Sequence, residues 1–183
     1  MTRLISACIV LLLVSCDHSE TTPLPSAQLA LSYDDVTYQD ISSCAFSLPI
    51  NTAGTLQRQG PCNIKIDYPA TKASIFMTYQ PVRNNLDTLL RDTQKLSYEH
   101  ARKASGIKAN PFIKPDTNVY GMLYEVSGNA ASSTQFYATD STKHFLAGSV
   151  YFDTRPNYDS LYPAIEYMRN DVAHIMEQLR WND

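Results

Sequence analysis

The sequence predicts an α+β fold in which a mainly antiparallel sheet is flanked by two long helices. Segments that alternate apolar and polar residues, as half-buried strands do, occur in two groups along the chain. Two longer segments carry apolar residues at helical spacing, one between these groups and one at the C-terminal end. The links within each group are short, and short links join antiparallel neighbours.

The composition is that of one folded domain. The chain has 183 residues, of which 44% are hydrophobic and 18% charged, as in globular rather than disordered proteins. Its formal charge is only −3, and its Lys and Arg residues are scattered along the chain. This distribution argues against a nucleic-acid-binding surface, which needs clustered basic residues.

The N-terminus has the pattern of a lipoprotein export signal. Arg3 provides a positive charge, residues 4–14 form a short apolar stretch, and the letters LVSC at residues 13–16 fit a lipobox. The apolar stretch is shorter than the about 20 residues of a membrane-spanning helix. We therefore predict a signal peptide over residues 1–15 and Cys16 as the lipid-bearing first residue of the mature protein. An ordinary cleaved signal followed by a coincidental cysteine is the alternative.

Residues 16–35 are predicted to be the lipidated end and a polar tether, and residues 36–183 to be one globular domain. Cys8 would leave with the signal, so Cys44 and Cys62 remain as a pair in an oxidising compartment. We expect them to form a disulfide, which would stabilise the fold by roughly 3 kcal/mol. A metal site is the alternative, but neither cysteine has another His or Cys at ligand spacing.

The first group of strands precedes the first helix. Residues 36–41 and 45–50 are weak strand candidates, and Pro49 is expected to break the second. Residues 63–68 alternate cleanly, and residues 74–80 follow after a link short enough for a hairpin.

Residues 85–105 have the apolar stripe of a helix. Asn84 or Asn85 can cap its start, and Gly106 can provide the left-handed residue that ends it. Residues 111–116 are expected to form a loop.

Three strands are predicted next, over residues 119–126, 134–139 and 144–152, and their short links make them an antiparallel meander. The first strand is apolar on both faces, so we expect both faces of the sheet to be covered. The residues of one face are Tyr120, Met122 and Tyr124, and those of the other are Val119 and Leu123.

The last helix is predicted over residues 160–181. Pro163 is best tolerated in a first turn, which makes Ser160 the expected N-cap. The order of elements is that of a helix–sheet–helix sandwich such as Mog1- and PsbP-like domains, a comparison that concerns the fold alone.

No catalytic residue, metal ligand or cofactor is predicted. The sequence has no nucleophile elbow, zinc-protease motif, phosphate-binding glycine loop or calcium loop. A hydrolase that uses Ser141 and His144 near Asp140 is one alternative, although these residues are close together on a tight turn. Another is a carrier or sensor of a small apolar ligand, which would need a sizeable apolar cavity.

Two links of the meander are candidates for contact with a partner protein. The first is rich in small residues that can present polar groups, and the second is a short polar turn. The partner-binding candidates are Gly128, Asn129, Ser132, Ser133, Asp140, Lys143 and His144. If these links lie at opposite ends of a strand, they cannot form a single surface.

The whole mature domain resembles the gliding motility lipoprotein GldD family of the Bacteroidota. The resemblance rests on YGMLYEVSGNAASS at residues 120–133, QF at 135–136, TDSTKHFL at 139–146 and YF at 151–152. It continues with PN at 156–157, DSL at 159–161 and Pro163, and it extends to the Cys44 and Cys62 pair.

The resemblance implies an accessory lipoprotein of the gliding machinery and its linked type IX secretion system, with no enzymatic activity. Other gliding lipoproteins, GldJ among them, would be its partners. The implied location is the cell envelope, lipid-anchored at the outer membrane and facing the periplasm.

Overall fold

The computed structural model describes residues 36–100, 104–155 and 157–182. The predicted signal peptide, the lipidated Cys16 and the tether lie outside the described residues. Within the described part of the chain, no helix is both long enough and apolar enough to cross a membrane.

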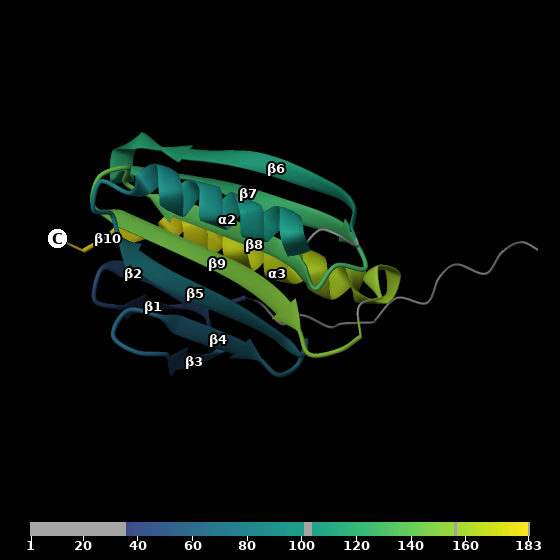
Figure 1. The fold of residues 1–183 in the computed structure, drawn as a ribbon. Helices are drawn as coiled ribbons and strands as arrows, with labels where there is room; N and C mark the ends of the chain where they lie inside the picture. The colour runs from purple at the N-terminus through teal and green to yellow at the C-terminus, as the bar shows by residue number, and fades with distance from the viewer. Residues whose placement is uncertain (1–35, 101–103, 156, 183) are drawn as a thin grey trace, which may run out of the picture.

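The larger sheet has seven strands, and every pair of neighbours is antiparallel. In spatial order the strands are β3 (Thr55–Arg58), β4 (Ile64–Tyr68), β5 (Ala73–Pro81), β9 (His144–Phe152), β8 (Ser132–Thr139), β7 (Val119–Gly128) and β6 (Ala104–Lys114) (Figure 1). The predicted hairpin of β4 and β5 and the predicted meander of β7, β8 and β9 are confirmed.

A smaller sheet has β2 (Phe46–Asn51) between β1 (Tyr38–Ser42) and β10 (Arg180–Trp181). The expectation that Pro49 breaks β2 is wrong, because Pro49 pairs with Asp40 inside a continuous strand. On its other side β2 pairs with β10 only at Ser47 and Phe46, so the missing N–H of Pro49 interrupts no ladder there.

Helix α3 (Tyr158–Gln178) packs on one face of the larger sheet, together with the smaller sheet. Its buried residues Met168, Val172 and Ile175 meet the inward-facing side chains of the strands in the main core. These strand residues recur with a period of two, as side chains on one face of a strand must. Examples from β4 and β5 are Ile64, Ile66, Tyr68, Ile75 and Met77.

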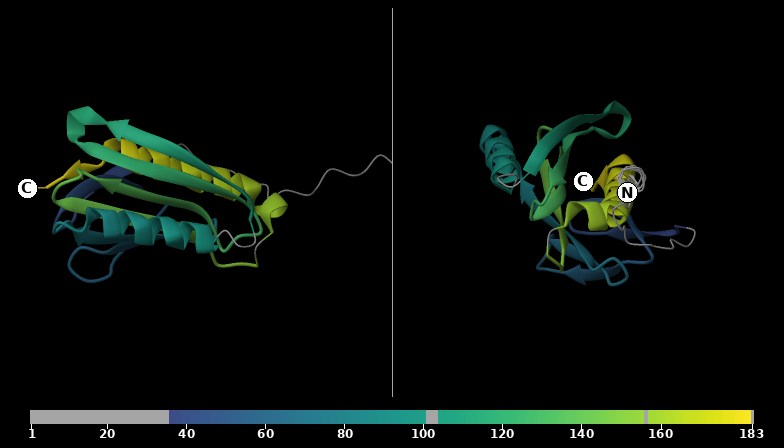
Figure 2. Two further views of the ribbon diagram at one scale, coloured as in Figure 1. Left: turned by 45° about the horizontal axis from the view of Figure 1, so that its top comes forward. Right: turned by 90° about the vertical axis from the view of Figure 1, so that its right-hand side faces the viewer.

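Helix α2 (Leu86–His100) lies on the opposite face (Figure 2). Its Leu89 packs in a second, smaller core with Tyr124 of β7, Tyr137 of β8 and Phe145 of β9. The expected α+β class with a mainly antiparallel sheet and two helices is confirmed. A complete sandwich is not, because this core does not extend to β3, β4 and β5, and the likeness to Mog1- and PsbP-like domains stays a prediction.

Two predictions for the middle of the chain are wrong: the helix expected over residues 85–105 is too long, and most of the loop expected over residues 111–116 is strand. Helix α2 ends at His100, and Ala104 already begins β6, which continues through Pro111 to Lys114. Gly106 lies in this strand, next to a register shift, and does not end a helix. Pairing with β7 overrides the local helix pattern, and Pro111 is tolerated because β6 is an edge strand. A short 3-10 helix, η2 (Pro115–Thr117), connects β6 to β7.

The boundaries of the last helix also differ from the prediction. Asn157 rather than Ser160 is the N-cap, and its side chain accepts a hydrogen bond from the Ser160 backbone N–H at 3.4 Å. Pro163 therefore lies in the second turn. At the other end the helix stops at Gln178, because Arg180 and Trp181 pair with β2 as β10.

The disulfide between Cys44 and Cys62 is present. Their Cα atoms lie 5.3 Å apart, within the usual range for a disulfide, and 18 positions separate them in sequence. The bond joins the segment before β2 to the segment before β4, and so links the two sheets.

Candidate interaction surface

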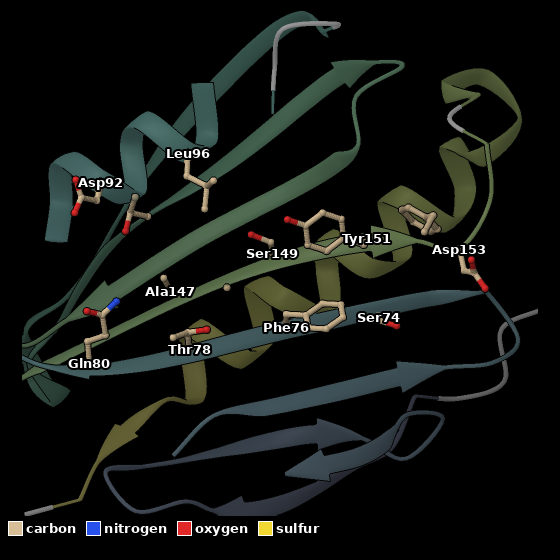
Figure 3. A pocket seen from close by; sticks show the side chains of 13 residues that line it. Ser74, Phe76, Thr78, Gln80, Asp92, Leu96, Ala147, Ser149, Tyr151 and Asp153 are labelled. Atoms are coloured by element: carbon tan, nitrogen blue, oxygen red, sulfur yellow. The ribbon is translucent and has the colours of Figure 1, made fainter. Parts of the chain in front are cut away.

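A groove lies on the sheet face that α2 leaves partly uncovered. It has a volume of about 770 Å³ and is formed by α2, β5 and β9 (Figure 3). We call it the α2 groove. Its lining residues are Ser74, Phe76, Thr78 and Gln80 of β5, Ala147, Gly148, Ser149, Tyr151 and Phe152 of β9, Asp153 after β9, and Asp92, Thr93 and Leu96 of α2.

The alternation of β5 explains the floor of the α2 groove. Ile75 and Met77 point into the main core, so their neighbours Ser74, Phe76 and Thr78 point the other way. Along this strand the core face is apolar and the groove face is polar except for one aromatic residue.

The centre of the α2 groove is apolar. Phe76 and Tyr151 meet edge to face with ring centroids 5.7 Å apart, a favourable geometry for aromatic pairs. Leu96 lines the wall from α2 and is 48% exposed, although it belongs to the apolar stripe of the helix. Leu96, Phe76 and Tyr151 thus give the α2 groove an apolar centre.

Ordered polar side chains from β4 border the α2 groove. Lys65 forms an ion pair with Asp67 at 2.7 Å, and its ammonium lies 5.3 Å from the Phe76 ring centre. The Ser74 hydroxyl donates to Asp67 at 2.6 Å. Hydrogen bonds from Lys65 and Ser74 hold the pKa of Asp67 below its usual value, so this carboxylate is ionised and already satisfied.

The ends of the α2 groove carry two further carboxylates, Asp92 and Asp153. Figure 3 places them at opposite ends, with Leu96, Phe76 and Tyr151 between them. Among the described residues, neither carboxylate has an ion pair within 4.0 Å.

The second predicted contact element, the turn after β8, is held together by Asp140. Its Oδ1 accepts backbone N–H groups from Thr142 at 3.0 Å, Lys143 at 2.8 Å and His144 at 2.8 Å. Partial burial opposes ionisation of Asp140, but these hydrogen bonds outweigh it and lower its pKa. Asp140 therefore has a structural role, whereas Ser141, Thr142 and Lys143 are exposed.

His144 is buried and engaged within the fold. Its Nδ1 lies 2.9 Å from the Tyr79 hydroxyl, and its ring stacks on Trp181 with centroids 5.1 Å apart. No hydrogen bond among the described residues joins His144 to Ser141. The structure thus contains no Ser–His–Asp relay at this turn.

The first predicted contact element, residues 128–133, supports the fold. The Oδ1 of Asn129 accepts the Tyr158 backbone N–H at 2.9 Å, at the start of α3. Ser132 and Ser133 are buried. Gly128 has a positive φ of 90° and lies against the backbone of Ser105, which leaves no room for a side chain. The two elements lie at opposite ends of β8, so they do not form one surface.

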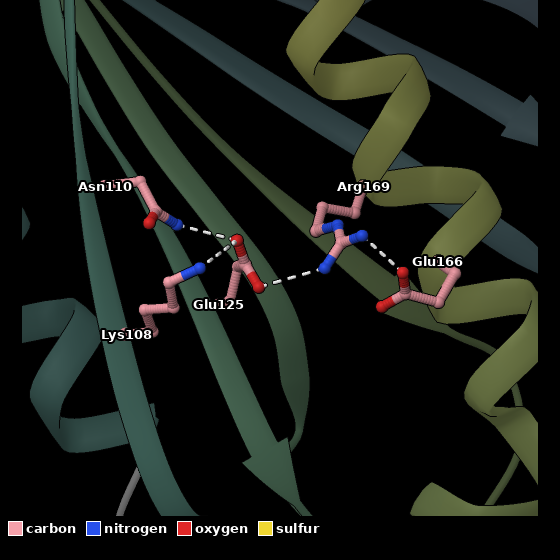
Figure 4. Close-up of polar contacts among 5 residues, drawn as sticks. All are labelled: Lys108, Asn110, Glu125, Glu166 and Arg169. Carbon is pink, nitrogen blue, oxygen red and sulfur yellow. Dashed lines mark hydrogen bonds and ion pairs between the residues drawn. The ribbon is translucent and has the colours of Figure 1, made fainter.

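A network of charged residues joins the outer strands to α3 (Figure 4). Glu125 of β7 pairs with Arg169 of α3 at 3.0 Å and accepts from Asn110 of β6 at 2.6 Å. Arg169 also pairs with Glu166. The Glu125 carboxylate is thereby used in contacts within the chain.

The described part of the structure has no enclosed site for a small apolar ligand or for a metal ion, the two remaining alternatives. Apolar side chains fill the space between α3 and the sheet, and the α2 groove is open rather than a closed apolar cavity. No cluster of three or more His, Cys, Asp or Glu side chains that could hold a metal occurs within the described ranges.

The α2 groove was not predicted from the sequence. Phe76 could have indicated the groove, because it is the one aromatic residue among the polar outward positions of β5. Leu96 could not have indicated it, since the spacing of Leu96 fits the buried stripe of a helix equally well.

Comparison with known proteins identifies one family. The family model described as gliding motility lipoprotein GldD matches residues 18–181, which is nearly the whole chain. No curated protein matches the chain significantly.

Proposed function

This chain belongs to the gliding motility lipoprotein GldD family, and we propose that it is a non-enzymatic component of the gliding machinery. In this role it supports the assembly or stability of that machinery and of its linked type IX secretion system. In this proposal Cys16 carries the lipid anchor and residues 16–35 form the tether. Residues 36–183 form the module that binds other envelope proteins.

The observation that carries the proposal is the uncovered part of the sheet face. The α2 groove combines an exposed leucine, an aromatic pair and ordered polar borders. Interfaces between proteins characteristically have such an aromatic centre within a polar rim. The Asp140 and His144 side chains, in contrast, are used within the fold, which leaves Asn129 and Lys143 as the exposed candidates among the seven predicted residues.

We propose an outer-membrane anchor that faces the periplasm, with other gliding lipoproteins, GldJ-like proteins among them, as partners. A short acylated end attached through a polar tether keeps a folded module near the membrane without burying it there.

The test is affinity purification of the tagged, lipidated full-length protein from its own membranes in mild detergent, with partners identified by mass spectrometry. We expect gliding or type IX secretion proteins to be recovered with the wild type. Leu96→Ser removes the apolar wall of the α2 groove and should lower this recovery by about tenfold.

Tyr98→Ser is the matched control, because Tyr98 is also on α2, is 59% exposed and does not line the α2 groove. It should leave the recovery unchanged. If the wild-type protein is recovered alone, even after crosslinking in cells, the proposed function is wrong.

A further inference from the structure

We propose that the α2 groove binds a segment of a partner protein in which apolar residues are flanked by a basic residue at each end. This inference rests on the proposed function and names the chemistry of the partner at that same site. It follows from the order of side chains along the groove, which is acidic at Asp92, apolar at its centre and acidic at Asp153 (Figure 3).

The two end carboxylates differ from the third acid beside the groove. Asp67 already has Lys65 as its counter-ion at 2.7 Å. Asp92 has no ion pair within the described residues, and Lys95, three positions further along α2, pairs with Glu99 at 3.9 Å. Asp153 uses its backbone N–H to bind the carbonyl of Lys72, and within the described residues its carboxylate has no ion pair. Basic groups of a partner would complement both ends.

The dimensions indicate a short segment. From Ser74 to Gln80, β5 rises by about 20 Å at the usual spacing of strand residues. An extended segment of about six residues, or nearly four turns of a helix, therefore spans the floor.

The floor of the α2 groove lies inside the sheet rather than at its edge, and this limits how the segment can bind. Strands β5 and β9 are paired with each other and each has a second neighbour, so neither offers free backbone groups for strand addition. Recognition must use side chains, with the apolar residues of the segment against Phe76, Tyr151 and Leu96. A membrane surface fits poorly, because acidic groove ends repel anionic headgroups.

The experiment uses full-length, lipidated protein in its own membranes. Asp92→Lys combined with Asp153→Lys reverses both groove ends. The matched control is Asp40→Lys combined with Asp116→Lys, which makes the same change in net charge at exposed positions outside the α2 groove. Thermal unfolding of each purified variant verifies that the fold is retained.

We expect the groove-end variant to recover about tenfold less partner than the wild type at low salt, and the control to recover as much as the wild type. A photo-crosslinking residue in place of Thr78, which is exposed on the groove floor, should capture a partner peptide with Lys or Arg on both sides of apolar residues.

Full recovery by the groove-end variant, with recovery lost in Leu96→Ser, would overturn this inference and leave the proposed function standing. Capture of a peptide without flanking basic residues, or of a second copy of this chain alone, would also overturn it. Failure of the wild type to recover any partner would overturn both proposals.

Discussion

The hydroxyl of Tyr68 on β4 donates a hydrogen bond to the buried carboxylate of Asp171 on α3, across 103 positions of sequence. Both side chains are 2% exposed. Within the described residues the other carboxylate oxygen, Oδ1, has no hydrogen-bond partner. Burial raises the pKa of Asp171, and the hydrogen bond from Tyr68, together with the nearby Tyr38, Asn51 and His174 side chains, offsets only part of this effect. A polar contact of this kind within a largely apolar core joins the sheet to the helix that covers it.

Tyr68→Phe should destabilise the fold by about 1–3 kcal/mol, because it leaves a buried carboxyl group without this donor. Urea unfolding of the purified protein measures the change. Tyr162→Phe is the control, since Tyr162 is 39% exposed on the same helix as Asp171 and its hydroxyl can bind water. Equal stabilities of the two variants would contradict the importance assigned to the Tyr68–Asp171 contact.

The stability of the protein should depend on pH through Asp171. Its pKa in the folded state lies above the usual 3.8, so between these two values the folded state binds more protons than the unfolded chain. Stability from this group is complete below pH 3.8 and is lost as the pH rises through the raised pKa. Asp67 and Asp140, whose pKa values are lowered, act oppositely and lose their contribution as the pH falls below 3.8.

Comparison of Asp171→Asn with the wild type isolates this effect, because the variant keeps Asp67 and Asp140. Free energies of unfolding measured at a series of pH values should show that the stability of the variant, relative to that of the wild type, increases as the pH rises above 3.8. A constant difference between the two proteins across the series would refute the raised pKa.

Gly121 is required by the close approach of β7 and β8. A Cβ at this position would overlap the backbone carbonyl oxygen of Tyr137, which cannot move without breaking the ladder. We expect Gly121→Ala to destabilise the fold by about 3 kcal/mol or more. Gly106→Ala should change stability by less than about 0.5 kcal/mol, because nothing lies within 4 Å of its Cβ position. Chemical denaturation of both variants tests the contrast.

The Cys44–Cys62 disulfide should contribute about 3 kcal/mol, the value expected for a loop of this length. Reduction of the wild type should lower its unfolding midpoint in urea by a corresponding amount. The double variant Cys44→Ser and Cys62→Ser should match the reduced protein and be insensitive to the reductant. A midpoint that reduction leaves unchanged would show that the loop is already ordered by other contacts.

Prediction from sequence succeeded where neighbouring residues decide the outcome. The alternation of Ile64, Ile66 and Tyr68 identified β4, and the apolar spacing of α3 identified that helix. Residues 104 and 105 show the limit of such reasoning, because their local pattern favours helix while β7 offers an unpaired edge. The backbone hydrogen bonds of that edge prevail, and they involve residues remote in sequence.

The predicted contact residues show the same limit at the level of the site. Small and polar residues at 128–133 and 140–144 suggested exposure, yet Ser132, Ser133 and His144 are buried and Asp140 closes its own turn. Polar residues can be satisfied inside a fold as well as at a surface, and composition does not distinguish the two cases.

Local sequence patterns were sufficient to predict the α+β class, the strands β4, β5 and β7 to β9, the presence of both helices, the disulfide pair and the family. Each depends on periodicity, cysteine count or a long characteristic motif, which are properties of contiguous residues. Contacts between distant segments were needed to establish that β6 and β10 are strands, that Asp171 is buried against Tyr68, and that Leu96, Phe76 and Tyr151 line one groove. These outcomes depend on which surfaces the packed sheet leaves available, and that is settled only when distant segments come together.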